Sequence, residues 1–214
     1  MEQRHILSPA IGKGSRLTRR AIAEGLAERY SPKATSSRGA CHPDGTLVPA
    51  AVLVPVIERG RDLSVLLTRR AAHLANHPGQ ISFPGGRLEM EDGGDAVACA
   101  LRETEAEIGL DRRRVTVVGR LDDYVTGTGF AITPVVGLTP APERLTPDPS
   151  EVAEIFEIPL DFLVDPDNYT RQTREVNGVM RPYWAVAWGE RVIWGATAGI
   201  LVNLSNMLVG RGER

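Results

Sequence analysis

The sequence predicts an α+β domain in which a mixed β-sheet is sandwiched between α-helices. Three observations predict it: apolar runs of strand length separated by turn residues, a well-capped amphipathic helix in mid-chain, and an apolar helix near the end. With 214 residues, 42% of them hydrophobic, the chain can bury one sizeable core. We therefore expect one main domain over residues 46–210, preceded by a helix and linker over residues 1–45.

The N-terminal part predicts a helix followed by an irregular connection. Within residues 16–30, the apolar residues Leu17, Ile22 and Leu26 form a partial stripe among charged side chains, as in an amphipathic helix. Ser, Pro, Gly and His then dominate residues 31–45, a composition typical of an exposed linker.

Strands are predicted on both sides of the central helix. Two β-rich runs, residues 47–57 and 62–70, precede it and are separated by a short polar turn. Further strands are expected at residues 115–125, 131–138, 152–158, 183–188 and 191–194. An apolar helix of roughly residues 196–208 then closes the domain.

The central helix over residues 95–108 is the most strongly marked element. Asp95 is the expected N-cap and Gly109 the expected stop. At about 100° per residue, one stripe of this helix can face the core, formed by Val97, Leu101, Thr104 and Ile108.

Two carboxylates, Glu103 and Glu107, project from this helix in nearly the same direction. Like charges placed so destabilise an isolated helix by about a few tenths of a kcal/mol, and a cation would relieve the repulsion. Hard oxygen ligands suit Mg²⁺ or Mn²⁺. Gly85 and Gly86, ahead of the helix, allow a tight turn that brings main-chain carbonyls near the same cation. Taken alone, such a glutamate pair is more often a solvated helix face.

Charge and cysteine content exclude several classes of protein. The formal net charge of -2 lacks the basic excess of a general nucleic-acid binder. Cys41 and Cys99 are too few for a disulfide framework or a thiolate zinc site, which fits a reducing cytoplasm. No stretch approaches about eighteen consecutive apolar residues. We expect a cytoplasmic protein whose partners include no nucleic-acid polymer and no membrane, and a homodimer stays open.

The segment from Gly86 to Leu110 resembles the Nudix box of the Nudix hydrolase family. The family pattern is G, five residues, E, seven residues, then R-E-U-x-E-E-x-G-U, where U is apolar. The aligned positions are Gly86, Asp92, Arg102, Glu103, Thr104, Glu107, Gly109 and Leu110, and Thr104 stands where an apolar residue is usual. Asp92 stands for a glutamate, and two additional residues before Arg102 require a bulge in the loop. Several matches at fixed spacing are a strong signal.

The resemblance implies a Nudix-type fold and a hydrolase that uses Mg²⁺ or Mn²⁺. It assigns the metal to Glu103, Glu107 and the main chain of Gly86, with Glu103 also a candidate base for water. Arg102 would orient a carboxylate. Ala106 replaces the first of two adjacent ligand glutamates, so we expect weaker metal binding.

A further carboxylate is often drawn from a distant loop in this fold. The candidates for this additional base or ligand are Glu151 and Glu154, and a solvated strand edge is the alternative interpretation.

Residues ahead of the Nudix box resemble the coenzyme A diphosphatase branch of the family. The resemblance comprises LLTRRA at residues 66–71, then Leu74, His77, Gly79, Gln80 and the run FPGG at residues 83–86. Residues 193–201, IWGATAGIL, are similar to the same branch. Ala75 stands where the branch has an arginine.

This resemblance implies hydrolysis of coenzyme A or an acyl-CoA to adenosine 3',5'-bisphosphate and 4'-phosphopantetheine. The residues expected to meet this small nucleotide substrate are Arg69, Arg70, Gly85 and Arg87. Two alternatives stay open. One is a Nudix hydrolase of another nucleoside diphosphate derivative, such as ADP-ribose, NADH or a dinucleoside polyphosphate. The other is a catalytically weak nucleotide-binding module, favoured if Ala106 has disabled the metal site.

Overall fold

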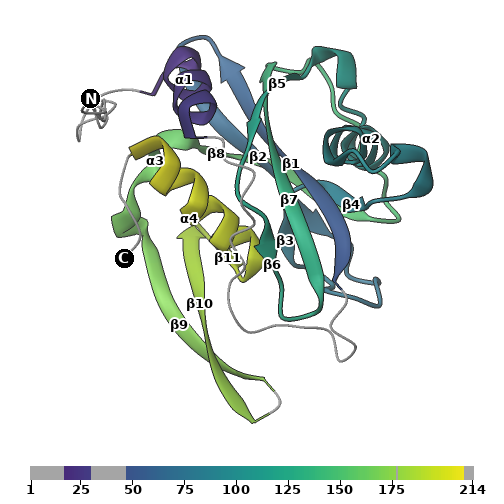
Figure 1. The fold of residues 1–214 in the computed structure, drawn as a ribbon, viewed down its shortest axis with the longest axis vertical. Coiled ribbons are helices and arrows are strands. Elements are labelled where there is room, and N and C mark those ends of the chain that lie inside the picture. Colours follow the sequence, from purple (N-terminus) through teal and green to yellow (C-terminus); the bar gives the residue numbers. More distant parts are fainter. Residues whose placement is uncertain (1–16, 30–46, 177, 210–214) are drawn as a thin grey trace, which may run out of the picture.

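A mixed sheet forms the centre of the molecule in the computed structural model, which describes residues 17–29, 47–176 and 178–209 (Figure 1). Its long strands follow the order β3-β2-β1-β7-β5, and β4, β6 and β8 pair with β1, β7 and β2. Strands β1 (Val48–Arg59) and β7 (Phe130–Pro140) run parallel. The remaining strands are β2 (Asp62–Arg70), β3 (Ile81–Ser82), β4 (Gly85–Arg87), β5 (Thr116–Arg120), β6 (Tyr124–Val125) and β8 (Val152–Pro159).

Helices cover both faces of this sheet. One face carries α2 (Ala96–Ile108), and the other carries α1 (Arg19–Arg29), α3 (Leu160–Val164) and α4 (Ala196–Val209). Strand β1 shows how the sheet separates two cores, because alternate side chains of a strand point to opposite faces. Leu53 and Ile57 pack on the α2 side, and Val54 and Val56 pack on the other side. The predicted α+β sandwich is confirmed.

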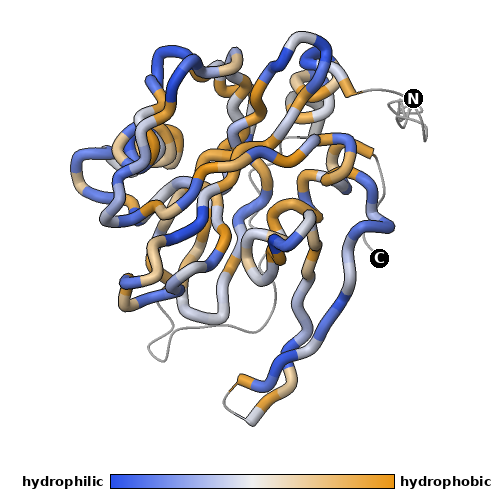
Figure 2. Tube along the Cα trace, turned by 180° about the vertical axis from the view of Figure 1, so that it is seen from behind, coloured by the Kyte–Doolittle hydropathy of each residue, from blue (hydrophilic) through white to orange (hydrophobic). Residues whose placement is uncertain are grey.

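A second sheet has three strands in the order β11-β10-β9. They are β9 (Tyr169–Val176), β10 (Val179–Trp188) and β11 (Arg191–Trp194). Figure 1 shows the β9–β10 hairpin extending away from the body of the molecule, and Figure 2 shows a largely hydrophilic shaft with apolar residues near its end. Strand β9 was not predicted, because residues 169–176 have no regular apolar alternation and are exposed almost throughout.

Other predicted boundaries differ in detail. Residues 115–125 form two strands instead of one, since the chain leaves the ladder at residues 121–123. The short helices η1 (Met90–Asp92), η2 (Arg112–Arg114) and η3 (Pro166–Asn168) were not predicted. The expected linker at residues 31–45 lies outside the described residues. Within the described part, none of the helices is long and apolar enough to cross a membrane.

The N-terminal helix contributes to the same core as the main domain. Leu17, Ile22 and Leu26 belong to the hydrophobic cluster that includes α4 and the adjoining face of the sheet. Gly119 of β5 lies directly below Leu26, where an added Cβ would come within 3.0 Å of the leucine Cβ. Helix α1 is therefore packed against the body of the domain, although the division of the chain at residue 45 stays a proposal.

Removing one of these side chains is expected to show how much α1 contributes to stability. Leu26 has no exposed surface, so Leu26→Ala should lower the free energy of unfolding by about 2–5 kcal/mol through lost burial and the remaining cavity. Urea unfolding measures the change. Leu47→Ala is the matched control, because Leu47 is 36% exposed and its truncation should cost less than about 0.5 kcal/mol. Equal effects at both positions would mean that α1 is not part of the cooperative unit.

Candidate active site

Helix α2 begins and ends where its sequence predicts. The side chain of Asp95 accepts a hydrogen bond from the backbone of Val97, and Arg120 pairs with the same carboxylate at 2.9 Å. Gly109 takes the left-handed conformation, with φ 69°, and its N–H bonds to the carbonyl of Glu105. These caps set the helix register and hence the direction of its glutamates.

The face of α2 that packs on the sheet differs from the predicted stripe. Thr104 and Ile108 are buried as expected, but Val97 and Leu101 are only half-buried. Three small residues complete the buried face: Ala96, Cys99 and Ala100. Small side chains let the helix lie close to β1 and β4, which rotates the packed face away from the larger residues. Close packing against β4 brings the two glutamates of interest onto the glycine backbone.

Gly85 and Gly86 meet these glutamates directly. The N–H of Gly85 donates to Oε2 of Glu107 at 3.3 Å. A Cβ on Gly86 would lie 2.6 Å from Cδ of Glu103, and a Cβ on Gly85 would lie 2.3 Å from the carbonyl oxygen of Ala51. Gly85 also has φ 152°, which disfavours any other residue. Both positions therefore require glycine, Gly85 for the strand pairing and Gly86 for the Glu103 carboxylate.

Arg102 holds two acidic side chains at the edge of this site. Its Nε and Nη2 donate to the two oxygens of Asp92 at 2.8 and 2.9 Å, and its Nη1 donates to Oε1 of Glu103 at 2.7 Å. The bidentate bond from Arg102, with a backbone bond from Glu89, holds the pKa of the buried Asp92 well below its usual value. Arg102 thus links the loop before α2 to the Glu103 carboxylate.

The two additional residues before Arg102 are accommodated in the η1 segment. Gly93 and Gly94 both have positive φ, 61° and 80°, and nothing lies within 4 Å of a Cβ at either position. The chain therefore turns back after Asp92 without moving its carboxylate away from Arg102. This is the bulge that the family pattern required.

A loop distant in sequence docks on the C-terminal end of α2. Thr146 donates its N–H to the carbonyl of Ile108 at 2.9 Å, and Asp148 donates to that of Glu107 at 2.8 Å. The carbonyl of Glu151 accepts from Ala71, the residue after β2, at 2.8 Å. These bonds satisfy helix carbonyls that have no partner within the helix. They also fix the position of Glu151.

Glu107 lies at the centre of a group of negative charges. It is 6% exposed, and burial, with the charges of Glu151 and Glu103, raises its pKa to about 8. Arg70 and the Gly85 N–H act in the opposite direction but do not cancel this shift. The surroundings of Glu107 therefore disfavour the charged form of its carboxylate.

Two candidate substrate-binding arginines of β2, Arg69 and Arg70, have different surroundings. Arg69 donates to Glu154 at 3.0 Å, and Arg191 of β11 pairs with the same carboxylate. These bonds, led by that from Arg191, lower the pKa of Glu154. Arg70 is different, because its buried Nε has no hydrogen-bond partner among the described residues. Arg69 and Arg70 are neighbours in β2, and successive side chains of a strand point to opposite faces of the sheet, which accounts for their different surroundings.

Arg87, at the end of β4, places its guanidinium over the ring of Phe130, 5.2 Å from the ring centre. Of the candidate residues, Arg70 lies near Glu107, whereas Glu154 forms ion pairs with Arg69 and Arg191. Glu105 lies on another side of α2 from Glu103 and binds Nε of Arg112 at 2.6 Å.

Sequence reasoning did not assign a role to Cys99. Its thiol donates to the carbonyl of Arg87 at 3.2 Å, and burial raises its pKa to about 11, so it stays protonated. This bond holds β4 against α2. The signal was available in the small size of positions 96, 99 and 100, a pattern that permits close approach of a helix to a strand.

The donor atoms fit a hard divalent cation. Carboxylate oxygens come from Glu103, Glu107 and Glu151, and Gly86 adds a backbone carbonyl in β4. Across the described ranges, no three His, Cys, Asp or Glu side chains stand at the spacing of a completed metal site. Burial first, and then the charges of Glu151 and Glu103, raise the pKa of Glu107, and a bound cation would favour the charged form of this carboxylate.

Comparison with known proteins gives consistent matches. A family model described as the NUDIX domain matches residues 47–177. The "Uncharacterized Nudix hydrolase NudL" of Photorhabdus laumondii is 36% identical over 159 residues, which are 74% of this chain and 84% of the relative. NudL of Citrobacter koseri is 37% identical over 156 residues, 73% and 80% of the two chains. A crystal structure of a MutT/nudix family protein from Enterococcus faecalis aligns with 91% of this chain and 71% of its own, at 12% identity and TM-score 0.48.

Proposed function

This chain belongs to the Nudix hydrolase family, and on that premise we propose that it hydrolyses the diphosphate bond of coenzyme A or an acyl-CoA with the help of Mg²⁺ or Mn²⁺. The products would be adenosine 3',5'-bisphosphate and 4'-phosphopantetheine. The observation that carries the proposal is the position of Glu103 and Glu107 against the backbone of β4, with Glu151 and Arg70 near enough to shift the pKa of Glu107.

Charge neutralisation is the main requirement of the reaction. The negative oxygens of a diphosphate repel an attacking water, and a bound divalent ion neutralises them and lowers the pKa of water. Glu103, Glu107, Glu151 and the carbonyl of Gly86 are the groups that would hold this ion. Glu151 would stand in for the carboxylate missing at position 106, because its loop is bonded to the last turn of α2.

Water activation and orientation fall to the same carboxylates. Glu103 is the proposed base, since Arg102 fixes its position and its carboxylate lies on Gly86. Glu151 is the second candidate. Glu154 is a weaker one, because two arginines already occupy its carboxylate. Arg102 acts as a positioning residue, as it contacts the acids and not the reacting bond.

Substrate recognition is proposed from the arginines and the coenzyme A-type signature. Arg70 offers a guanidinium next to the acidic group, with one N–H unpartnered, so a diphosphate oxygen would supply the missing acceptor. Arg87 would meet a second phosphate. Arg69 is held by Glu154 and would support the wall of the site. The missing arginine at Ala75 favours the alternative, a diphosphate derivative without the 3'-phosphate.

A substrate panel tests this proposal. The protein is incubated with Mg²⁺ or Mn²⁺ and coenzyme A, acetyl-CoA, ADP-ribose, NADH or a dinucleoside polyphosphate, and the products are separated. Coenzyme A and its thioester should be cleaved fastest, with adenosine 3',5'-bisphosphate as product. Faster cleavage of ADP-ribose would show that the proposed substrate is wrong and that the proposed diphosphate hydrolysis is right. Binding without cleavage of any compound would favour the weak binding module.

Gly86→Ala is expected to separate activity from stability. The new Cβ would collide with the end of the Glu103 side chain, which can rotate away, so the unfolding midpoint should change little while hydrolysis falls by about tenfold to a hundredfold. Gly127→Ala is the control, because nothing lies within 4 Å of a Cβ there and its φ is not positive. Unchanged activity in Gly86→Ala would show that the Glu103 position does not matter.

A further inference from the structure

The β9–β10 hairpin is a two-stranded arm beyond the third strand of its sheet. Strand β11 pairs only with residues 185–188 of β10, so Val179–Trp184 and Arg171–Val176 pair with each other alone. The side chains of residues 171–176 and 178–182 are all exposed, which means that neither face of the arm is covered by described residues. A lone two-stranded ribbon is marginally stable in water. An arm of this kind gains stability from a surface packed alongside it.

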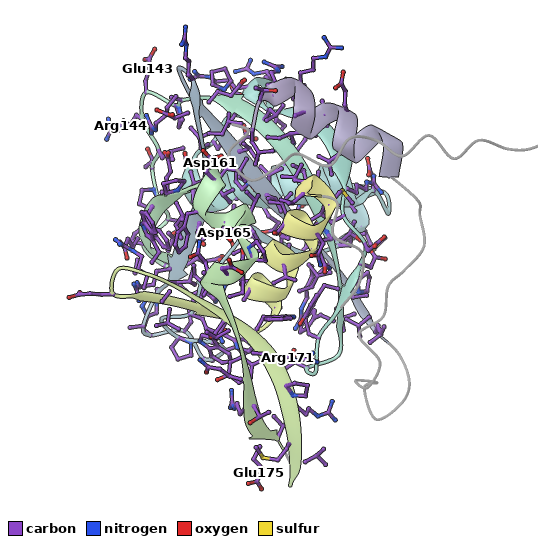
Figure 3. The ribbon with its side chains drawn as sticks, turned by 90° about the vertical axis from the view of Figure 1, so that its left-hand side faces the viewer. Glu143, Arg144, Asp161, Asp165, Arg171 and Glu175 are labelled. Atoms are coloured by element: carbon purple, nitrogen blue, oxygen red, sulfur yellow. The ribbon has the colours of Figure 1, made fainter. Side chains whose placement is uncertain are left out.

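Strand β9 also leaves its outer edge without a neighbour in the described part of the chain. An edge strand presents unpaired N–H and C=O groups that another strand can pair with. The charges on this edge have both signs: Arg171 and Arg174 are positive and Glu175 is negative. Within the described residues neither Arg171 nor Glu175 forms an ion pair, and Figure 3 shows both on the arm. The guanidinium of Arg171 lies over the ring of Trp184, 5.6 Å from the ring centre.

The order of residues in β9 is complementary to itself in one antiparallel register. Directly opposed residues of an antiparallel pair lie on the same face of the sheet. When two identical strands pair about a two-fold axis, one residue must therefore lie opposite its own copy, and the axis is named here by that residue. With the axis at Thr173, each Arg171 lies opposite a Glu175, and the two Thr173 side chains face each other. With the axis at Gln172 these ion pairs are lost. With the axis at Arg174, two arginines collide.

We propose that β9 is the interface of a homodimer, in which two copies of this chain pair antiparallel about Thr173 and join their three-stranded sheets into one six-stranded sheet. Two Arg171–Glu175 pairs and a Thr–Thr pair then lie across the axis. The register also sets the reach of each arm. Val176 falls opposite Thr170 of the second copy, so the apolar end of β9 lies beside the base of the neighbouring sheet, and Val179 of β10 pairs with Val176 from the other side.

Charge reversal tests the interface and its register together. Sedimentation velocity on the full chain should show a dimer for the wild type. Glu175→Arg turns two attractive pairs into repulsive ones and should weaken association by about tenfold or more. The double exchange Arg171→Glu with Glu175→Arg should restore the dimer, because it swaps the signs and keeps the pairing. Glu143→Arg makes the same charge change at the far end of the molecule and should have no effect (Figure 3).

Cross-linking gives a second readout that does not depend on charge. In a Cys41→Ser background, Thr173→Cys should form a covalent dimer under mild oxidation, since directly paired Cα atoms lie about 4.5–5.5 Å apart and fit a disulfide. Gln172→Cys, opposite Arg174 in this register, should not. A wild type that stays monomeric up to about millimolar concentration, or a dimer that Glu175→Arg leaves intact and neither cysteine cross-links, would overturn the proposal.

Discussion

Glu103→Gln and Glu107→Gln are each expected to reduce hydrolysis by at least about a hundredfold, because a lost carboxylate removes a few kcal/mol of charge neutralisation in the transition state. Glutamine keeps the size of the side chain, so packing on Gly86 and the bond from Gly85 can persist. Glu107→Gln should not lower the free energy of unfolding. The buried, repelled carboxylate of Glu107 favours its neutral form, which glutamine resembles.

Steady-state rates with saturating metal, together with unfolding midpoints, measure this prediction. Glu105→Gln is the matched control on the same helix, because Glu105 binds Arg112 away from the other two carboxylates, and its activity should change little. A loss of similar size at all three positions would mean that the helix face is assigned wrongly. A loss that follows the unfolding midpoint would indicate a structural effect only.

Ala106→Glu is expected to tighten the dependence of activity on Mg²⁺ or Mn²⁺ by roughly tenfold or more. Ala106 is exposed, lies three residues after Glu103 and directly precedes Glu107, so a glutamate there has room to reach the same cation. The added ligand should matter most at low metal, where on the proposed assignment the wild type would rely on Glu151, waters and substrate phosphates. Turnover at low metal should rise accordingly.

Metal titrations of wild type and Ala106→Glu measure this effect, and Ala106→Gln separates charge from side-chain size. The glutamine variant should follow the wild type. Superimposed curves for wild type and Ala106→Glu, with equal turnover of coenzyme A, would show that position 106 does not face the metal and that the roles taken from the motif need revision.

Much of the fold was predictable because its signals are local. The caps of α2 at Asp95 and Gly109, the exact bounds of β2 and β11, and the closing helix all follow from periodicity, turn residues and capping. The motif also placed Glu103 and Glu107 on one helix side next to two glycines. What it could not supply was the packed face of α2, since small residues at positions 96, 99 and 100 shift that face by close approach.

Features that depend on distant segments were not predictable in the same way. The proximity of Glu151 to Glu107 arises from backbone bonds between its loop and the last turn of α2, and no residue pattern reports such bonds. The choice between Arg69 and Arg70 depends on Glu154 of β8, which lies opposite Arg69 in the ladder and binds it. Strand β9 was missed because its side chains face solvent on both sides, which removes the alternation that marks a half-buried strand.

Binding of Mn²⁺ to the protein, followed by the loss of the free-ion signal in electron paramagnetic resonance, tests most directly that the acids of α2 and the Glu151 loop form a cation site. This readout needs no substrate. The wild type and Glu105→Gln should bind the ion, and the double variant Glu103→Gln with Glu107→Gln should lose at least about tenfold in affinity. Equal binding by the wild type and the double variant would contradict the account.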